Sequence, residues 1–198
     1  RFRYDGGIII TASHTPNPYN GFKLTKEDAM PLSGEDGILW IRDYLARQSF
    51  SRSNKISSRG ETARKSIQKE YIDFNFRLAK MKRGALRGLT VVLDGGNGIG
   101  GPVTLRFLKE AGVRVESLYV NPDGRFPHHV PDPLLKFNIK DVIELVKRVK
   151  PDCGIALDGD ADRLIFIDEK GGPVPGDLIT AALATRLLEK RRGGKVIY

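Results

Sequence analysis

Residues 87–96, "RGLTVVLDGG", begin the stretch that decides the fold. Their apolar, β-branched run predicts a buried strand that ends at Asp94. The segment 101–112, "GPVTLRFLKEAG", predicts a helix that Gly112 closes, and 113–120, "VRVESLYV", predicts a second strand. A strand, a helix and another strand in this order form a βαβ unit, whose two strands run parallel.

Strands and helices continue to alternate after residue 120. The ranges 139–150 and 177–194 predict helices, whereas 153–160 and 163–172 predict strands. Strands that alternate with helices of about 10–15 residues indicate parallel sheets. We therefore predict an α/β protein with two βαβ-type domains and mixed, mostly parallel sheets, divided near residues 82–88.

Composition places the chain among globular proteins and limits its function. It has 198 residues, 40% of them hydrophobic, which is enough for a core. Cys153 is the single cysteine, so a disulfide framework is excluded and a reducing, cytoplasmic location is expected. No stretch approaches the ~20 apolar residues of a membrane span, so no membrane partner is expected.

The net charge of +9 is concentrated in one segment. Residues 47–87 contain twelve Lys/Arg and three Asp/Glu, which accounts for the whole excess. The segment opens with the serine-rich 47–60, which we expect to be a loop, and continues as a basic surface helix within 61–83. Four residues at helical spacing predict the apolar face of this helix: Ile67, Tyr71, Phe74 and Leu78. No RNA- or DNA-binding motif accompanies the charge, so nucleic acid is not expected as a partner.

The segment 11–23, "TASHTPNPYNGFK", follows a short apolar run, "GGIII", at residues 6–10. The run predicts a buried strand, and the Pro and Asn-Gly positions after it force turns. Ser13 and His14 are therefore expected on a loop at the end of a strand, where ligands of α/β proteins usually bind. An ordinary polar surface turn is the alternative that this loop alone leaves open.

A second polar stretch, "LDGDADRL" at 157–164, places Asp158, Asp160 and Asp162 two residues apart, with Arg163 beside them. Carboxylates this close repel one another, and a hard divalent cation removes that repulsion. A calcium-binding EF-hand is excluded, because its loop needs glycine where Arg163 stands. A solvated acidic turn is the other alternative. Because guanidinium matches phosphate, a metal beside arginine indicates phosphoryl transfer.

The stretch "GGNGIGG", residues 95–101, offers a competing function. Gly96, Gly98 and Gly101 have the spacing of a dinucleotide-binding turn, and Glu116 follows about 20 residues later. Asp94 at the start of this turn disfavours a pyrophosphate, and a nicotinamide enzyme has no use for an aspartate triplet. A dinucleotide-binding oxidoreductase that uses the turn Gly96–Gly101 remains an alternative, as does a tight turn without a ligand.

Taken together, "TASHTPNPYNGFK" and "DGDADR" resemble the α-D-phosphohexomutases of the phosphomannomutase/phosphoglucomutase group. The first motif matches the family's Thr-Ala-Ser-His-Asn-Pro and Tyr-Asn-Gly-Phe-Lys pattern except at Thr15, where the family has Asn. Residues 91–101, "VVLDGGNGIGG", resemble the start of the family's second domain, which accounts for the glycine spacing. Residues 124–138, "GRFPHHVPDPLLKFN", resemble its Phe-Pro-Asn-His-His-Pro-Asp-Pro segment, with departures at His128 and Val130.

The resemblance implies roles for particular side chains. Ser13 would carry the transferable phosphoryl group, and its phosphate would join the three aspartates in binding Mg²⁺. Arg163 would lie near the phosphates. His14 and Lys23 would support the reaction, and Lys23 would be the candidate for proton transfer as well as a phosphate contact.

The activity implied by the resemblance is the interconversion of hexose 6-phosphate and hexose 1-phosphate, with mannose or glucose as the sugar. The reaction would pass through a phosphoserine and a hexose 1,6-bisphosphate, which serves as intermediate and activator. A non-catalytic fragment that binds a phosphosugar or Mg²⁺ without turnover is the further alternative.

The resemblance also implies four domains, of which this chain would hold a part. Residues 1–84 would be the C-terminal part of the phosphoserine domain (domain I), 85–172 the metal-binding domain II, and 173–198 the start of domain III. The chain begins without Met and ends in "KVIY", which reads as the opening of a strand. We therefore expect two partners, a phosphosugar and the remainder of its own chain, from domains I, III and IV.

Overall fold

The computed structural model describes residues 3–15, 18–47, 60–191 and 193–197. The chain forms two compact units, one from Arg1–Thr11 and Asn20–Ile67, and the other from Ala12–Tyr19 and Gln68–Tyr198. The loop that contains Ser13 therefore belongs to the second unit, together with the acidic segment around Asp158.

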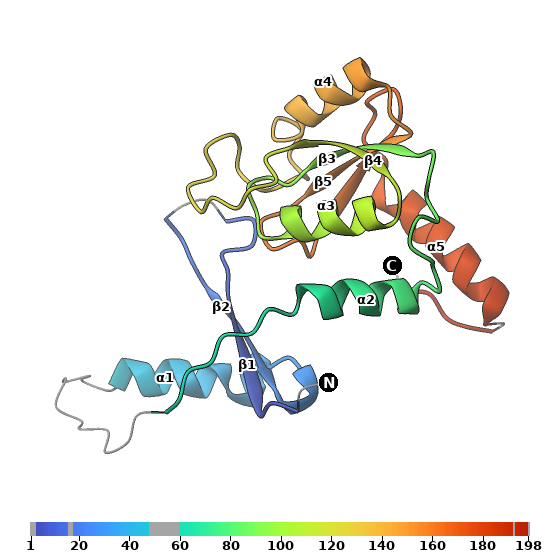
Figure 1. Cartoon of the computed structure of the whole chain (residues 1–198). Coiled ribbons are helices and arrows are strands. Elements are labelled where there is room, and N and C mark those ends of the chain that lie inside the picture. Colours follow the sequence, from blue (N-terminus) through green and yellow to red (C-terminus); the bar gives the residue numbers. More distant parts are fainter. Residues whose placement is uncertain (1–2, 16–17, 48–59, 192, 198) are drawn as a thin grey trace. The chain divides into compact units, whose positions relative to one another are not determined.

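The second unit is built around a four-stranded sheet with the order β4–β3–β5–β6 (Figure 1). Its strands are β3 (Thr90–Asp94), β4 (Arg114–Leu118), β5 (Cys153–Leu157) and β6 (Leu164–Ile167). β3 pairs in parallel with both β4 and β5, whereas β6 runs antiparallel to β5. The prediction of a mixed, mostly parallel sheet is confirmed for this unit.

Helices cover both faces of this sheet (Figure 1). The helices α2 (Gln68–Leu78) and α3 (Gly100–Glu110) share one core cluster with Val91 and Leu93 of β3. On the other face, α4 (Lys140–Val149) packs with Val92. This division follows from the strand geometry, because successive side chains of a strand point to opposite faces. The last helix, α5 (Gly176–Lys190), has no buried residue among those described.

The prediction of which residues form the apolar face of the basic helix is wrong. In α2 the buried side chains are Ile72 and Phe76, and the Phe76 ring lies 4.9 Å from that of Phe107 in α3. The four residues assigned to that face are 50–68% exposed: Ile67, Tyr71, Phe74 and Leu78. Both sets have helical spacing, so the spacing alone could not decide which one packs against α3.

The first unit contains a hairpin and a helix. Strand β1 (Gly6–Ile10) pairs antiparallel with β2 (Phe22–Lys26), and a 3₁₀ turn, η1 (Glu27–Ala29), follows. A π-helical turn, η2 (Gly34–Ile38), leads into α1 (Leu39–Arg47). Ser33 caps this turn, since the Asp36 amide donates to the Ser33 hydroxyl at 3.2 Å.

The prediction that residues 6–10 form a buried strand is half right. They form β1, but Ile8, Ile9 and Ile10 are 66%, 50% and 66% exposed. Among the described residues, β1 pairs with β2 alone. A two-stranded ribbon has no core of its own on either face. The β-branched run of β1 is therefore exposed, whereas the β-branched run of β3 is buried.

Two further predictions concern a membrane span and the serine-rich loop. Within the described ranges, no helix is long and apolar enough to cross a membrane. The serine-rich loop predicted for 47–60 lies outside the described residues except at its two ends.

Candidate functional site

The acidic segment lies in the loop between β5 and β6, at the carboxyl end of β5. We call residues 158–162 the acidic loop. It contains three aspartates, Asp158, Asp160 and Asp162, each with a carboxylate oxygen within 4.8 Å of the others. Asp158 is fully buried, Asp160 is half-buried and Asp162 is exposed. The three carboxylates therefore converge on one point.

Backbone hydrogen bonds hold the acidic loop in place. The Asp158 amide donates to the carbonyl of Arg163 at 3.3 Å, and the Ala161 amide donates to the Asp158 carbonyl at 3.2 Å. The Arg163 amide donates to Oδ1 of Asp158 at 3.1 Å. Ala161 has a φ of 59°, in the left-handed region that L-residues rarely adopt. This tight turn brings side chains that alternate along the sequence toward one point.

The electrostatics of the acidic loop favour a cation. Burial raises the pKa of Asp158, and so does repulsion from Asp160 and Asp162, whereas the hydrogen bond from the Arg163 amide lowers it. A hard divalent cation bound by carboxylate oxygens would relieve both the burial cost and the repulsion. The donor set, three carboxylates from one loop, fits Mg²⁺, which takes oxygen ligands.

Ser13 lies against this carboxylate cluster. Its hydroxyl is 3.4 Å from Oδ2 of Asp158 and 3.3 Å from Oδ1 of Asp160, so it can donate to either one. The same Oγ lies 3.3 Å from Nδ1 of His14. Ser13 has a φ of 53°, which costs about 1 kcal/mol for a residue with a side chain. The second unit thus brings together four predicted residues and a fifth, His14, beside them.

Gly159 makes this approach possible. A Cβ at this position would overlap the backbone oxygen of Ser13 and lie 3.3 Å from Cγ of Pro131. Only glycine lets the serine loop, residues 12–15, come so close to the acidic loop. Neither Gly159 nor Pro131 was singled out from the sequence, because nothing in the pattern "DGDADR" shows which backbone passes its glycine.

Two predicted site residues have other placements. Lys23 lies in β2 of the first unit, where it pairs with Ile9 of β1. Arg163 follows the acidic loop directly, is half-buried, and ties its backbone to Asp158 as described above. Their predicted contacts with phosphate remain predictions.

The glycine turn before α3 does not fit a pyrophosphate. Every backbone amide from 95 to 99 donates within the chain: Gly95 to Leu118 O, Gly96 to Asp94 Oδ1, Asn97 to Tyr119 O, Gly98 to Gly95 O, and Ile99 to Gly159 O. A Cβ on Gly98 would lie 2.6 Å from the Gly159 carbonyl oxygen. A dinucleotide-binding turn needs amides and space that face a ligand. Here Gly98 and Gly100 allow close packing against the acidic loop, and Gly95 and Gly101 allow it against residues 119–120.

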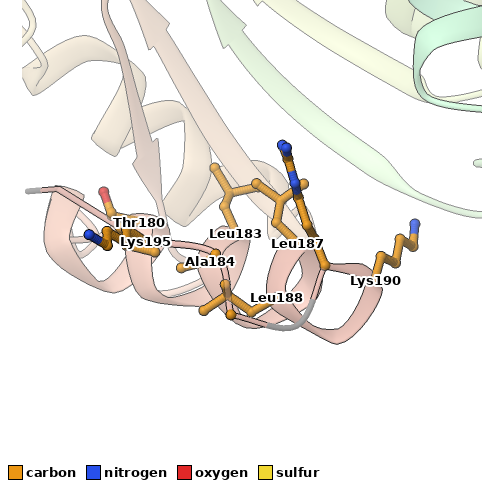
Figure 2. Close-up of a pocket in the computed structure, with 11 residues that line it drawn as sticks. Thr180, Leu183, Ala184, Leu187, Leu188, Lys190 and Lys195 are labelled. Carbon is orange, nitrogen blue, oxygen red and sulfur yellow. The ribbon is translucent and has the colours of Figure 1, made fainter.

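A large hollow elsewhere in the second unit contains none of the predicted site residues. It has a volume of about 830 Å³ and is lined by α5 and residues 193–196 (Figure 2). Leu183, Leu187 and Leu188 supply much of its wall, together with Lys190 and Lys195. No carboxylate is among its described lining residues, so the cation chemistry is assigned to the acidic loop instead.

Comparison with known proteins gives two matching family models. The model of phosphoglucomutase/phosphomannomutase alpha/beta/alpha domain II matches residues 69–172, and that of domain I matches residues 1–52. The first range contains the acidic loop and the second contains Ser13. The two loops that meet in the structure thus come from two different domains of one family.

Similar proteins have names that agree with these models. A phosphomannomutase of Escherichia coli is 38% identical over 200 residues, which cover 98% of this chain and 43% of that protein. A phosphoglucomutase/phosphomannomutase of Thermococcus kodakarensis is 37% identical, with 99% and 42% covered. The crystal structure of a phosphoglucomutase/phosphomannomutase family protein from Burkholderia thailandensis superposes with a TM-score of 0.78 at 30% identity, covering 96% of this chain and 39% of that one. The chain thus spans less than half the length of these relatives.

Proposed function

Because this chain belongs to the phosphoglucomutase/phosphomannomutase family, we propose that it is part of a hexose-phosphate mutase. The mutase interconverts hexose 6-phosphate and hexose 1-phosphate, and the names of the relatives favour mannose and glucose as the sugars. The observation that carries the proposal is the position of the Ser13 hydroxyl, 3.3 and 3.4 Å from two carboxylates of the acidic loop.

Ser13 is the proposed carrier of the phosphoryl group. In the transfer step, the bond between phosphorus and Oγ of phosphorylated Ser13 breaks as a bond from phosphorus to a sugar hydroxyl oxygen forms. The proton of that hydroxyl ends on Oγ of Ser13, with Lys23 as the candidate to relay it. A hexose 1,6-bisphosphate results. When it gives back its other phosphate, the net change is a phosphate moved between C6 and C1.

The acidic loop is the proposed cation site. Asp158, Asp160 and Asp162 would hold Mg²⁺, and an oxygen of the phosphate on Ser13 would complete its ligands. A bound Mg²⁺ neutralises negative charge on the oxygens of the phosphoryl group during transfer. Arg163 and His14 are proposed to contact the same phosphate.

The proposed reaction also implies partners and a cellular location. The partners are a phosphosugar, with hexose 1,6-bisphosphate as activator, and the remainder of the mutase's own chain. The location is the cytoplasm, which agrees with a half-buried free thiol at Cys153. Nucleic acid has no role in the proposed reaction.

A labelling experiment tests the proposal. The full-length mutase is incubated with a hexose 1,6-bisphosphate and Mg²⁺, and intact-mass and peptide analysis then locates any added phosphate. We expect one phosphate on Ser13, none in Ser13→Ala, and unchanged labelling in Ser33→Ala, since Ser33 only caps a helix. Phosphate found only at another residue would refute Ser13 as the carrier.

A further inference from the structure

A buried ion pair lies behind the acidic loop. Nε2 of His129 is 3.1 Å from Oδ2 of Asp94, at the end of β3. The side chain of Asp94 is 1% exposed and that of His129 is 11% exposed. Neither residue takes part in the proposed transfer step. Burying such a pair costs desolvation energy on both partners. A structural role for the pair would offset this cost.

The two hydrogen-bond partners of His129 favour its charged form. Nδ1 of His129 lies 2.9 Å from the carbonyl oxygen of Val130, an atom that can only accept. Nε2 faces a carboxylate, which also accepts. An imidazolium, with hydrogen on both ring nitrogens, satisfies both contacts. Burial lowers the pKa of His129, but the Asp94 carboxylate and the Val130 carbonyl outweigh it and leave the pKa raised.

The pair reaches the acidic loop through the glycine turn. The other oxygen of Asp94, Oδ1, accepts the Gly96 amide at 2.8 Å and so fixes the start of the turn. At its end, the Ile99 amide donates to the carbonyl of Gly159 at 3.1 Å. Gly159 stands between two of the carboxylates that face Ser13. A second route runs through Pro131, two residues after His129, which packs against the positions of both Gly96 and Gly159.

We propose that the Asp94–His129 pair positions the acidic loop for its cation, by holding the 95–99 turn and Pro131 against Gly159. The inference rests on the proposed cation site and adds two positioning residues that do not touch the metal. Residues that hydrogen-bond to a metal ligand typically change metal affinity by about 10–100-fold. The Asp94–His129 pair acts one step further back, so we expect the lower end of that range.

Other titratable side chains also lie near His129: Tyr119, His128 and Asp141. Tyr119, which follows β4, packs edge-on against the ring of His129 with centroids 5.6 Å apart, and it stacks on His128. Burial and the hydrogen bond to Asp141 of α4 raise the pKa of Tyr119 to about 12, so its hydroxyl stays protonated. His128 bonds the Asn97 side chain at 2.7 Å. Asp141 adds a charge near His129 without bonding it.

Asp94 and Asp141 therefore provide a matched pair of variants. Asp94→Asn removes the carboxylate that bonds His129, whereas Asp141→Asn removes one that bonds Tyr119 and acts on His129 only through its charge. With His129→Gln as a third variant, Mg²⁺ binding is measured by calorimetry at pH about 6, where the ring is charged. We expect affinity about tenfold weaker in Asp94→Asn and His129→Gln, and within about twofold of wild type in Asp141→Asn.

A second measurement needs no metal. Exchange of the Ile99 amide reports on its bond to the Gly159 carbonyl, and we expect it to be at least about tenfold faster in His129→Gln than in wild type. Wild-type Mg²⁺ affinity and wild-type Ile99 protection in His129→Gln would overturn the inference alone. A wild-type chain without saturable Mg²⁺ binding would overturn the proposed cation site and the inference together.

The wild-type protein supplies a third test that does not depend on variants that fold. Because the pKa of His129 is raised from 6.5, its contribution is complete below pH 6.5 and is lost as pH rises through the raised value. Mg²⁺ affinity should therefore fall as pH rises from 6.5 through the raised pKa of His129, although carboxylate ionisation alone would not lower it. A flat profile in that window would contradict the inference.

Discussion

The serine loop (12–15) and the acidic loop (158–162) meet at one site but are held in different ways. The acidic loop directly follows β5, whose residues 154–157 are buried. Hydrogen bonds also join this loop to the backbone of Arg163 and to the amide of Ile99. The serine loop leaves β1, whose residues are exposed. The Thr15 amide donates to the Ala12 carbonyl at 2.9 Å, which closes that loop on itself.

This difference matches the two tasks that we propose. A cation holder must keep several repelling carboxylates at fixed separations, which requires a scaffold that is built into the core. A phosphoryl carrier must present one oxygen to a sugar and then to the same sugar turned around. Each loop nevertheless holds one residue in the left-handed region, Ser13 in the serine loop and Ala161 in the acidic loop.

The largest effect is expected from Asp160→Asn, which removes a charge from the acidic loop. The amide is a weaker cation ligand, and charge stabilisation by a metal contributes several kcal/mol to transfer. Transfer of phosphate from a hexose bisphosphate to Ser13, followed by quenched-flow mass spectrometry, should slow by about a thousandfold. Unfolding of the metal-free variant should require as much denaturant as wild type or more, because repulsion with Asp158 is relieved. Wild-type transfer in Asp160→Asn would contradict a metal role, and Asp43→Asn on α1 is the control.

Gly159→Ala tests whether the two loops need their close contact. The added methyl group would overlap the Ser13 backbone oxygen, so the serine loop must move away. We expect transfer to Ser13 to fall by about a hundredfold, since a displacement near 1 Å has this cost, while Mg²⁺ binding weakens less. Gly124→Ala, where a Cβ would meet open space, should leave both unchanged. Equal transfer rates in the two variants would show that the contact is not needed.

Gly98→Ala separates packing from cofactor binding in the glycine turn. The new Cβ would lie 2.6 Å from the Gly159 carbonyl, so the variant should lose about 1–3 kcal/mol of unfolding free energy in urea titrations. Calorimetry with NAD and NADP should show no binding to either protein. Micromolar nucleotide binding by wild type that Gly98→Ala abolishes would instead support the oxidoreductase alternative.

The smallest effect is expected from Thr15→Asn, which restores the family's residue in the serine loop. The described role of Thr15 is a backbone bond to Ala12, which any residue except proline can make. Transfer rates to Ser13 should therefore change by less than about threefold. A gain of tenfold or more would mean that the serine loop, like the acidic loop, depends on a precise side-chain bond.

Much of the second unit could be predicted from the sequence. Its strands and helices followed from periodicity and turn residues, and the two-residue spacing of the three aspartates pointed to a cation site. Burial could not be predicted equally well. "GGIII" and "TVVLD" are both β-branched runs, yet β1 is exposed and β3 is buried, because only β3 has helices on both faces.

The contacts behind the site lay beyond the reach of sequence patterns. Gly159 was read only as part of an acidic motif, and His129 only as part of a resemblance. Their roles come from long-range packing, against Ser13 in one case and Asp94 in the other. The choice between the two apolar stripes of α2 failed for the same reason, since α3 decides which one is buried.

One measurement addresses the central claim, that Ser13 and the acidic loop form a single phosphoryl-transfer site. The full-length protein is phosphorylated on Ser13, Mn²⁺ replaces Mg²⁺, and the phosphoserine resonance is followed by ³¹P NMR. Mn²⁺ held by the acidic loop should broaden this signal beyond detection, and Asp160→Asn should restore it at equal metal concentration. A sharp phosphoserine signal while Mn²⁺ is bound to the acidic loop would contradict the account.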